Sequence, residues 1–129
     1  MKTNELTGAA LDWAVAEAEG LPKAVDSSGL DGPVIVCGFE QEVLHSQHRK
    51  GQEWKAYQPS TNWAQAGPII EREGVGIYQY RGAWAAHCPL PNGRLHACME
   101  NQPTPLIAAM RCYVASKLGD EVELPKELT

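Results

Sequence analysis

Several features that would assign this chain to a class of protein are missing or scarce. No apolar run in its 129 residues approaches the roughly 20 residues of a membrane span. Basic residues number 11 against 16 acidic ones, and the resulting net charge of −5 disfavours nucleic acid as a partner, because a duplex binder needs a basic surface. Residues 1–20 lack the basic and apolar regions of a secretory signal. We therefore expect a cytoplasmic protein that binds neither membrane nor nucleic acid.

Signatures of chemistry are also scarce. Cys37, Cys88, Cys98 and Cys112 show no close C-x-x-C pairing, which is typical of reduced thiols in a cytosol. No G-x-S-x-G, P-loop or H-E-x-x-H motif occurs, so no catalytic residue is assigned. The length suits one domain over residues 1–129, which can bury a core without disulfides or metals. These absences favour a non-catalytic protein over an enzyme.

Turn signals in the middle of the chain predict a three-stranded antiparallel meander. Asn92-Gly93 suits a two-residue hairpin turn, and Arg81-Gly82 is a weaker turn. The two turns set registers that place the same residues of the middle strand on one face. That expected core face consists of Val75, Ile77, Trp84, Ala86, Cys88, Leu90, Leu95, Ala97 and Met99. Residues 34–39 and 53–57 are interpreted as further strands, and residues 20–33 as a loop.

Capping signals predict a helix near each end of the chain. The first is expected between Thr7 and Gly20, and the last between Thr104 and Gly119. Small residues on one arc of the last helix predict that it is covered on two sides, and they are compatible with a homodimer. Residues 120–129 are expected to be extended and partly frayed. The predicted class is α+β, with a small antiparallel sheet, including the meander at 75–100, packed against the N-terminal and C-terminal helices.

The stretch PSTNWAQAGPIIEREG, residues 59–74, is predicted to form a corner of the fold. A short turn capped by Ser60 or Thr61 is expected to end at Gly67. A helix is then expected to begin at Pro68, because proline is tolerated at the first position of a helix. This corner explains most of the stretch. It leaves three side chains without a structural role: Asn62, Trp63 and Gln65.

Two tryptophans are the better candidates for a binding surface. Trp13 lies off the apolar stripe of the first helix, and Trp63 lies in the predicted turn. Exposed aromatic side chains near polar groups are the usual anchors of protein interfaces. Asn62, Gln65 and Asp12 could hydrogen-bond the indole edges or a ligand. The alternative is that both tryptophans fold back onto neighbouring elements as part of a satellite core.

A weaker pattern concerns metal binding. The register set by the Asn92-Gly93 turn places His87 opposite Cys98, with His96 two residues from Cys98 on the same face. Three such groups could hold zinc and leave a fourth position for water or for a histidine from residues 45–52. No familiar zinc spacing is matched. The alternative is a half-buried sheet face with scattered polar residues and no cofactor.

Three stretches together carry a family resemblance: ELTGAALDWAVAEAEG (5–20), PSTNWAQAGPIIEREG (59–74) and PTPLIAAMRCYVASKLGDEVELP (103–125). As a series they resemble the NinX family of phage proteins, found in tailed phages and in prophages. Here STNW stands where the family pattern suggests STDW, and QAGP where QGGP is usual. The resemblance implies a small accessory protein that acts in the bacterial cytoplasm, and it carries over no activity, cofactor or catalytic residue.

These observations lead to two hypotheses of different classes. The first is a phage or prophage accessory protein that binds a host or phage protein through Trp13, Asn62, Trp63 and Gln65. The alternative is a small metal- or ligand-binding enzyme that uses the outer sheet face around His87, His96 and Cys98.

Overall fold

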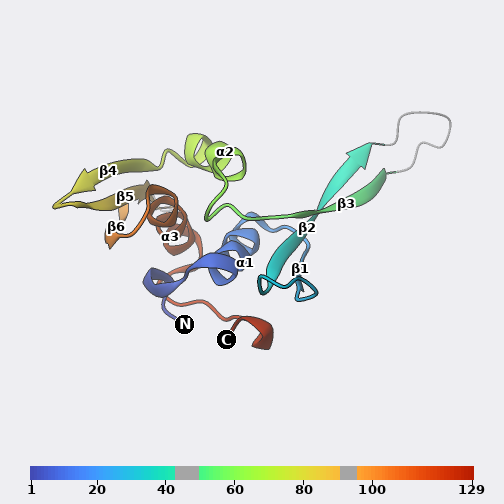
Figure 1. The fold of residues 1–129 in the computed structure, drawn as a ribbon. Coiled ribbons are helices and arrows are strands. Elements are labelled where there is room, and N and C mark those ends of the chain that lie inside the picture. The colour runs from blue at the N-terminus through green and yellow to red at the C-terminus, as the bar shows by residue number, and fades with distance from the viewer. Residues whose placement is uncertain (43–49, 91–95) are drawn as a thin grey trace.

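The structure is a computed structural model that describes residues 1–42, 50–90 and 96–129. Within those ranges it contains three α-helices, two short 3₁₀ segments and two three-stranded antiparallel sheets, which confirms the α+β class (Figure 1). The elements in chain order are η1 (Thr3–Glu5), α1 (Gly8–Glu19), β1 (Lys23–Asp26), β2 (Val34–Glu42), β3 (Lys50–Ala56), α2 (Trp63–Glu73), β4 (Gly76–Tyr80), β5 (Ala83–Pro89), β6 (His96–Gln102), α3 (Pro105–Leu118) and η2 (Lys126–Leu128).

The meander forms the β4–β5–β6 sheet in the predicted register. Ala86 on β5 pairs with Ile77 on β4 and with Met99 on β6. Of the predicted core face, Val75, Ala86, Cys88 and Met99 are buried, while Ile77 and Leu90 are half-buried. Trp84 is half-buried rather than buried, beside an irregularity in the β5–β6 pairing. The Asn92-Gly93 turn lies outside the described residues.

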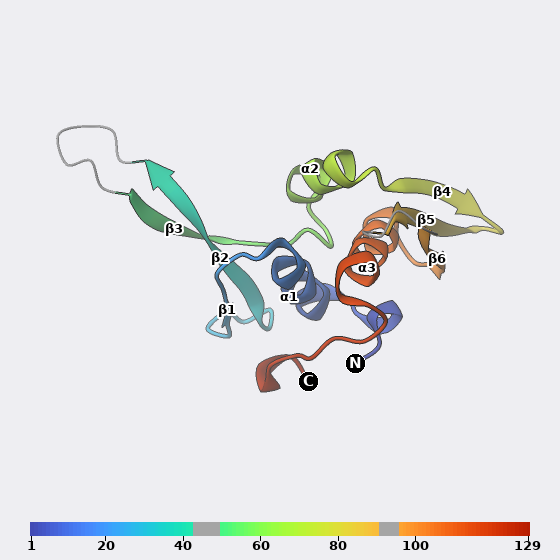
Figure 2. The same cartoon turned by 180° about the vertical axis from the view of Figure 1, so that it is seen from behind.

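The remaining strands form a second sheet rather than joining the first. Its order is β1–β2–β3, and β1 lies within residues that were predicted to be a loop. That prediction was wrong because β1 is a short edge strand of four residues with little apolar pattern, and its pairing with β2 defines it. Strands β2 and β3 continue beyond β1 and extend away from the helices as an arm (Figures 1 and 2).

Helix α3 is the centre of the core. Its apolar arc and its small arc are both buried, so Met110 and Cys112 are each 0% exposed. Strands β5 and β6 contact α3, and helices α1 and α2 contact it as well (Figure 2). Thr104 caps the helix, since its hydroxyl oxygen accepts a hydrogen bond from the Ile107 N–H at 3.1 Å. The prediction of a helix covered on two sides is confirmed.

Helix α2 contradicts the expectation that Gly67 ends a turn and that Pro68 begins a helix. The helix begins earlier and is continuous, with Pro68 inside it. It begins at residue 63 because the side chain of Asn62 caps it by accepting a hydrogen bond from the Ala64 N–H at 2.9 Å. Pro68 removes one backbone hydrogen bond, the one to the Ala64 carbonyl. Burial of Ile69, which is 2% exposed, favours the continuous helix.

The first and last segments are hydrogen-bonded to each other. The Thr3 N–H donates to the Asp120 carbonyl at 2.8 Å, and the Val122 N–H donates to the Met1 carbonyl at 2.9 Å. The Thr3 hydroxyl also donates to the Gly119 carbonyl at 2.7 Å. The tail is therefore anchored as far as Val122. Along residues 1–42, 50–90 and 96–129, no helix combines the length and the apolar character needed to cross a bilayer.

Arg111 of α3 is buried where η1 and β6 meet the helix. It is 7% exposed, and its Nε donates to the Leu6 carbonyl at 2.7 Å. Its Nη1 donates to the side-chain oxygen of Gln102, which is 6% exposed. Burial lowers the pKa of the Arg111 guanidinium, and the charge of Glu5 opposes that effect. This side chain joins the N-terminal segment to the sheet.

Candidate functional site

The predicted corner is held by side-chain hydrogen bonds to the backbone. Gln65 uses both ends of its amide: its oxygen accepts from the Gln58 N–H at 2.7 Å, and its nitrogen donates to the Ala56 carbonyl at 2.8 Å. Asn62 uses its oxygen as the cap of α2. Two of the predicted binding residues thus have structural roles, which their sequence positions did not reveal. They fix the start of α2 relative to the end of β3.

Asp12 fastens the same corner to α1. It is 4% exposed, and its Oδ1 accepts a hydrogen bond from the Ser60 N–H at 2.9 Å. Burial raises the pKa of the Asp12 carboxyl to about 6, although the hydrogen bonding of Ser60 acts to lower it. The polar group that we expected to face an indole or a ligand therefore bonds to the backbone of the corner.

Trp63 is the exposed side chain that this corner presents. It is 55% exposed at the first position of α2. It borders a cleft of about 230 Å³ between the starts of α2 and α3. The cleft is lined by Ser60, Thr61, Trp63, Thr104, Pro105 and Leu106. The Trp63 ring is therefore not packed as a core residue, and its binding role stays a prediction.

Trp13 lies elsewhere, so the structure does not bring the two predicted tryptophans together. It is half-buried against the core and borders a different cleft, between α1 and the segment after α3. The Lys23 ammonium lies 4.7 Å from the centroid of its ring. The same ammonium is 2.6 Å from the Glu17 carboxylate. Trp13 and Trp63 thus border separate clefts.

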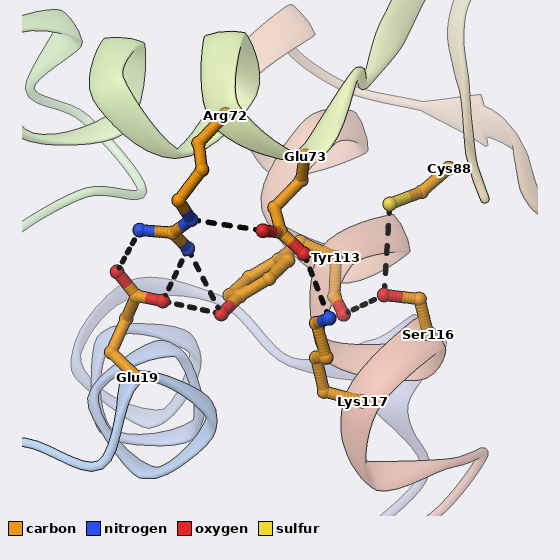
Figure 3. A network of polar contacts seen from close by, with 7 residues as sticks. All are labelled: Glu19, Arg72, Glu73, Cys88, Tyr113, Ser116 and Lys117. Carbon is orange, nitrogen blue, oxygen red and sulfur yellow. Dashed lines mark hydrogen bonds and ion pairs between the residues drawn. The ribbon is translucent and has the colours of Figure 1, made fainter. Parts of the chain in front are cut away.

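A network of charged and hydroxyl groups joins the three helices (Figure 3). Glu19 at the end of α1 accepts two hydrogen bonds from Arg72 of α2, at 2.6 and 3.1 Å, and one from the Tyr113 hydroxyl of α3. Glu73 accepts from the Arg72 Nε at 2.9 Å and lies 2.8 Å from the Lys117 ammonium. These two cations hold the pKa of Glu73 below its ordinary value. Since the charged groups satisfy one another, the network is structural.

The zinc prediction remains untested. The backbone register does place His87 opposite Cys98, as predicted, and Pro89 opposite His96. The side chains at 96–98 lie outside the described residues. The ring of His87 lies 5.8 Å from that of Tyr78, and it passes so close to Gly76 that a Cβ added there would clash with the imidazole. Among the side chains that the structure describes, no group of three or more His, Cys, Asp and Glu could hold a metal ion.

The described cysteines do not resemble nucleophiles. Cys37, Cys88 and Cys112 are buried. Burial raises the pKa of Cys37 to about 11, and burial also raises that of Cys88. Reactive thiols need a lowered pKa and access to solvent, so these three are core residues.

The comparisons with known proteins agree with the resemblance found in the sequence. The family model described as "Bacteriophage P22, NinX" matches residues 2–117. That range includes Trp13, Trp63 and all three helices except the last residue of α3, but not the tail residues that line the Trp13 cleft. No curated protein matches the chain. Because the matched range covers most of its length, the chain belongs to the bacteriophage P22 NinX family.

Proposed function

We propose that this NinX-family protein is a non-catalytic phage or prophage accessory protein that acts in the bacterial cytoplasm by binding a host or phage protein. The observation that carries the proposal is Trp63, a tryptophan 55% exposed beside an apolar hollow. Tryptophan is strongly enriched among the residues that dominate protein interfaces. Its position at the first turn of α2 gives the exposed ring no evident role in stability.

The support beneath Trp63 strengthens this proposal. Asn62, Gln65 and Asp12 each direct a side chain to the backbone of the corner, so the indole is presented on a fixed platform. A rigid anchor loses little conformational entropy on binding, and that raises affinity for a given contact area. The residues predicted from sequence as direct contacts would then contribute by holding Trp63 in place.

Affinity capture with matched variants tests the proposal. The tagged wild-type protein, Trp63→Ala and Trp54→Ala are each used to capture proteins from the same bacterial lysate, with and without phage infection. Trp54 on β3 is the control because it is also a tryptophan and is 50% exposed. We expect a stoichiometric partner with the wild type and with Trp54→Ala, and its loss with Trp63→Ala.

The purified partner then gives a quantitative answer. Truncating an interface anchor typically costs about 2 kcal/mol or more, which is roughly a 30-fold increase in Kd. An equal Kd for wild type and Trp63→Ala would remove Trp63 from the interface. The absence of any partner for all three proteins would contradict the binding function itself.

One observation supports the second candidate function, that of a metal- or ligand-binding enzyme. The register that places His87 opposite Cys98 is the register on which that prediction depended. Zinc would bind there as a Lewis acid or as a structural ion. Elemental analysis of protein purified without chelator, compared with His87→Ala, tests it. Zinc that is substoichiometric, or unchanged in the variant, ends this candidate.

A further inference from the structure

The cleft beside Trp13 has a composition that suits one kind of ligand. It has a volume of about 430 Å³ and lies between α1 and the segment after α3. Four of its lining side chains are apolar and come from the end of α3 and the segment after it: Leu118, Val122, Leu124 and Pro125. The charged side chains that line it are both carboxylates, Glu17 of α1 and Glu123 of the tail. An apolar hollow with negative charge and an indole ring favours a cation attached to an apolar stem.

The molecule already places a cation on this indole. Lys23, whose side chain is only 18% exposed, holds its ammonium 4.7 Å from the Trp13 centroid and 2.6 Å from Glu17. Lys23 does not line the cleft itself. The geometry shows that the Trp13 ring and a neighbouring carboxylate are arranged to accept positive charge.

Glu123 is the carboxylate that this internal lysine does not reach. It is exposed, and within the described ranges it forms no ion pair or hydrogen bond. Its tail segment also carries Asp120, Glu121 and Glu127 against a single lysine, Lys126, so the side chains of the segment have a net negative charge. A cationic ligand would gain here both from the local carboxylate and from the wider field.

We propose that the Trp13 cleft binds an arginine side chain within an extended, apolar-flanked segment of a partner protein. The guanidinium meets the indole and the Glu17 and Glu123 carboxylates, and the apolar neighbours of the arginine pack on Leu118 and Leu124. Arginine suits the site because a planar guanidinium can stack on an indole while it donates to carboxylates. This site is independent of the Trp63 proposal, because the two clefts share no lining residue.

A peptide titration followed by NMR tests the proposal. The probe is acetyl-Leu-Arg-Leu-amide, added to the ¹⁵N-labelled protein while the indole N–H of Trp13, assigned with Trp13→Phe, is observed. The matched control peptide carries citrulline, which is uncharged and has nearly the same shape as arginine. We expect the arginine peptide to shift the Trp13 indole signal and the backbone signals of residues 118–125. Loss of the charge should weaken binding roughly tenfold, as expected for a cation–π contact assisted by carboxylates.

Two double variants separate the cleft from the general acidity of the tail. Glu17→Gln with Glu123→Gln removes the carboxylates of the cleft, and Glu121→Gln with Glu127→Gln removes equal charge from tail positions that do not line it. The first pair should weaken the arginine peptide roughly tenfold, and the second pair about twofold or less, since distant exposed charges are screened by salt. All four positions are exposed and are substituted by an isosteric neutral residue, although Glu17→Gln also removes the ion pair with Lys23.

Several results would overturn the proposal. Equal binding of the citrulline peptide would show an apolar groove without charge recognition. Equal loss in the two double variants would show non-specific attraction to an acidic surface. Shifts at Trp13 that depend on protein concentration without any peptide would identify a second copy of the chain as the occupant. Failure of the Trp63 capture experiment would leave all of these readouts unaffected.

Discussion

The protein joins its helices by polar groups in two ways, and burial distinguishes them. In the network at the ends of α1 and α2, the Arg72 side chain is 51% exposed while it pairs with Glu19. In the interior, Arg111 is 7% exposed and Asp12 is 4% exposed, and each bonds to backbone of a distant segment. An ion pair with one exposed partner gains less because water already solvates that partner, whereas a buried group leaves its partner unsatisfied when it is removed. The single buried contacts should therefore be energetically more important than the larger, partly exposed network.

The largest effect is expected at Arg111. Arg111→Ala leaves the Leu6 carbonyl and the Gln102 side-chain oxygen without this donor, and it opens space beside α3. Loss of buried hydrogen bonds to a charged group should lower the free energy of unfolding by about 3 kcal/mol. Guanidinium denaturation measures this loss of free energy of unfolding. The control is Lys117→Ala, on the same helix but in the exposed network, for which we expect less than about 1 kcal/mol. Equal losses in the two variants would break the comparison.

Asp12 should give the next effect, and its two substitutions should differ. Asp12→Ala leaves the buried Ser60 N–H without its acceptor, and it should cost about 1–3 kcal/mol at pH 5. Asp12→Asn retains an oxygen acceptor but carries no charge. At pH 7.5 it should be more stable than the wild type, because it avoids the burial of a carboxylate. A thermal melt series compares the three proteins.

The pH dependence of stability follows from the same residue. Its pKa of about 6 in the folded protein exceeds the value of about 3.9 expected in the unfolded chain. The folded state therefore binds this proton more tightly, so the contribution is fully present below about pH 4 and is lost as the pH rises through 6. The wild type should lose on the order of 2 kcal/mol relative to Asp12→Asn between pH 4 and pH 7.5. A constant difference across this range would show that Asp12 has an ordinary pKa.

The partly exposed network should contribute little to the free energy of unfolding, and its contribution should depend on salt. Glu19→Gln removes the charge that Arg72 pairs with, yet it keeps one acceptor for the Tyr113 hydroxyl. The expected loss is about 1 kcal/mol at low ionic strength, and it should fall further as salt screens the pair. Urea denaturation at two salt concentrations measures both. A loss as large as that of Arg111→Ala would mean that the network behaves as a buried one.

Substitution of Trp63 should have the smallest effect on stability. Trp63→Ala is expected to change the free energy of unfolding by less than about 0.5 kcal/mol, as for other exposed positions away from special contacts. Trp54→Ala is the matched control for the exposure of the ring. A loss of 2 kcal/mol or more for Trp63→Ala, as for a buried side chain, would assign this residue to the fold and remove the reason to regard it as a binding anchor.

The sequence predicted those parts of the molecule that depend on local signals. The residues around Ala86 follow from turn geometry, and the bounds of α1 and α3 follow from Thr7, Gly20 and Thr104. The start of α2 was wrong because Pro68 and Gly67 are strong local signals that burial of the helix overrides. Asp12 was identified as a hydrogen-bonding residue, but its partner was not.

The site was harder to predict because its contacts are distant in sequence. Glu19 and Arg72 are separated by 53 residues, and no spacing or motif indicates that they meet. Trp63 was selected correctly as an exposed side chain, while the roles of Asn62 and Gln65 depend on where β3 ends. The sequence predicts the same binding role for Trp13 and Trp63. In the structure they border different clefts, because the tail packs beside Trp13 on α1.

The pairing of the two ends of the chain has a consequence for the order in which the protein folds. The hydrogen bond from Arg111 to Leu6 spans 105 residues, and the one from the N-terminal amine to Val122 spans 121. Contacts of such long range form slowly, because a large loop must close before they contribute. During synthesis, Leu6 leaves the ribosome before α3 and the tail, so these long-range contacts form only after both have emerged. The segment around Leu6 is thus among the last to complete its contacts.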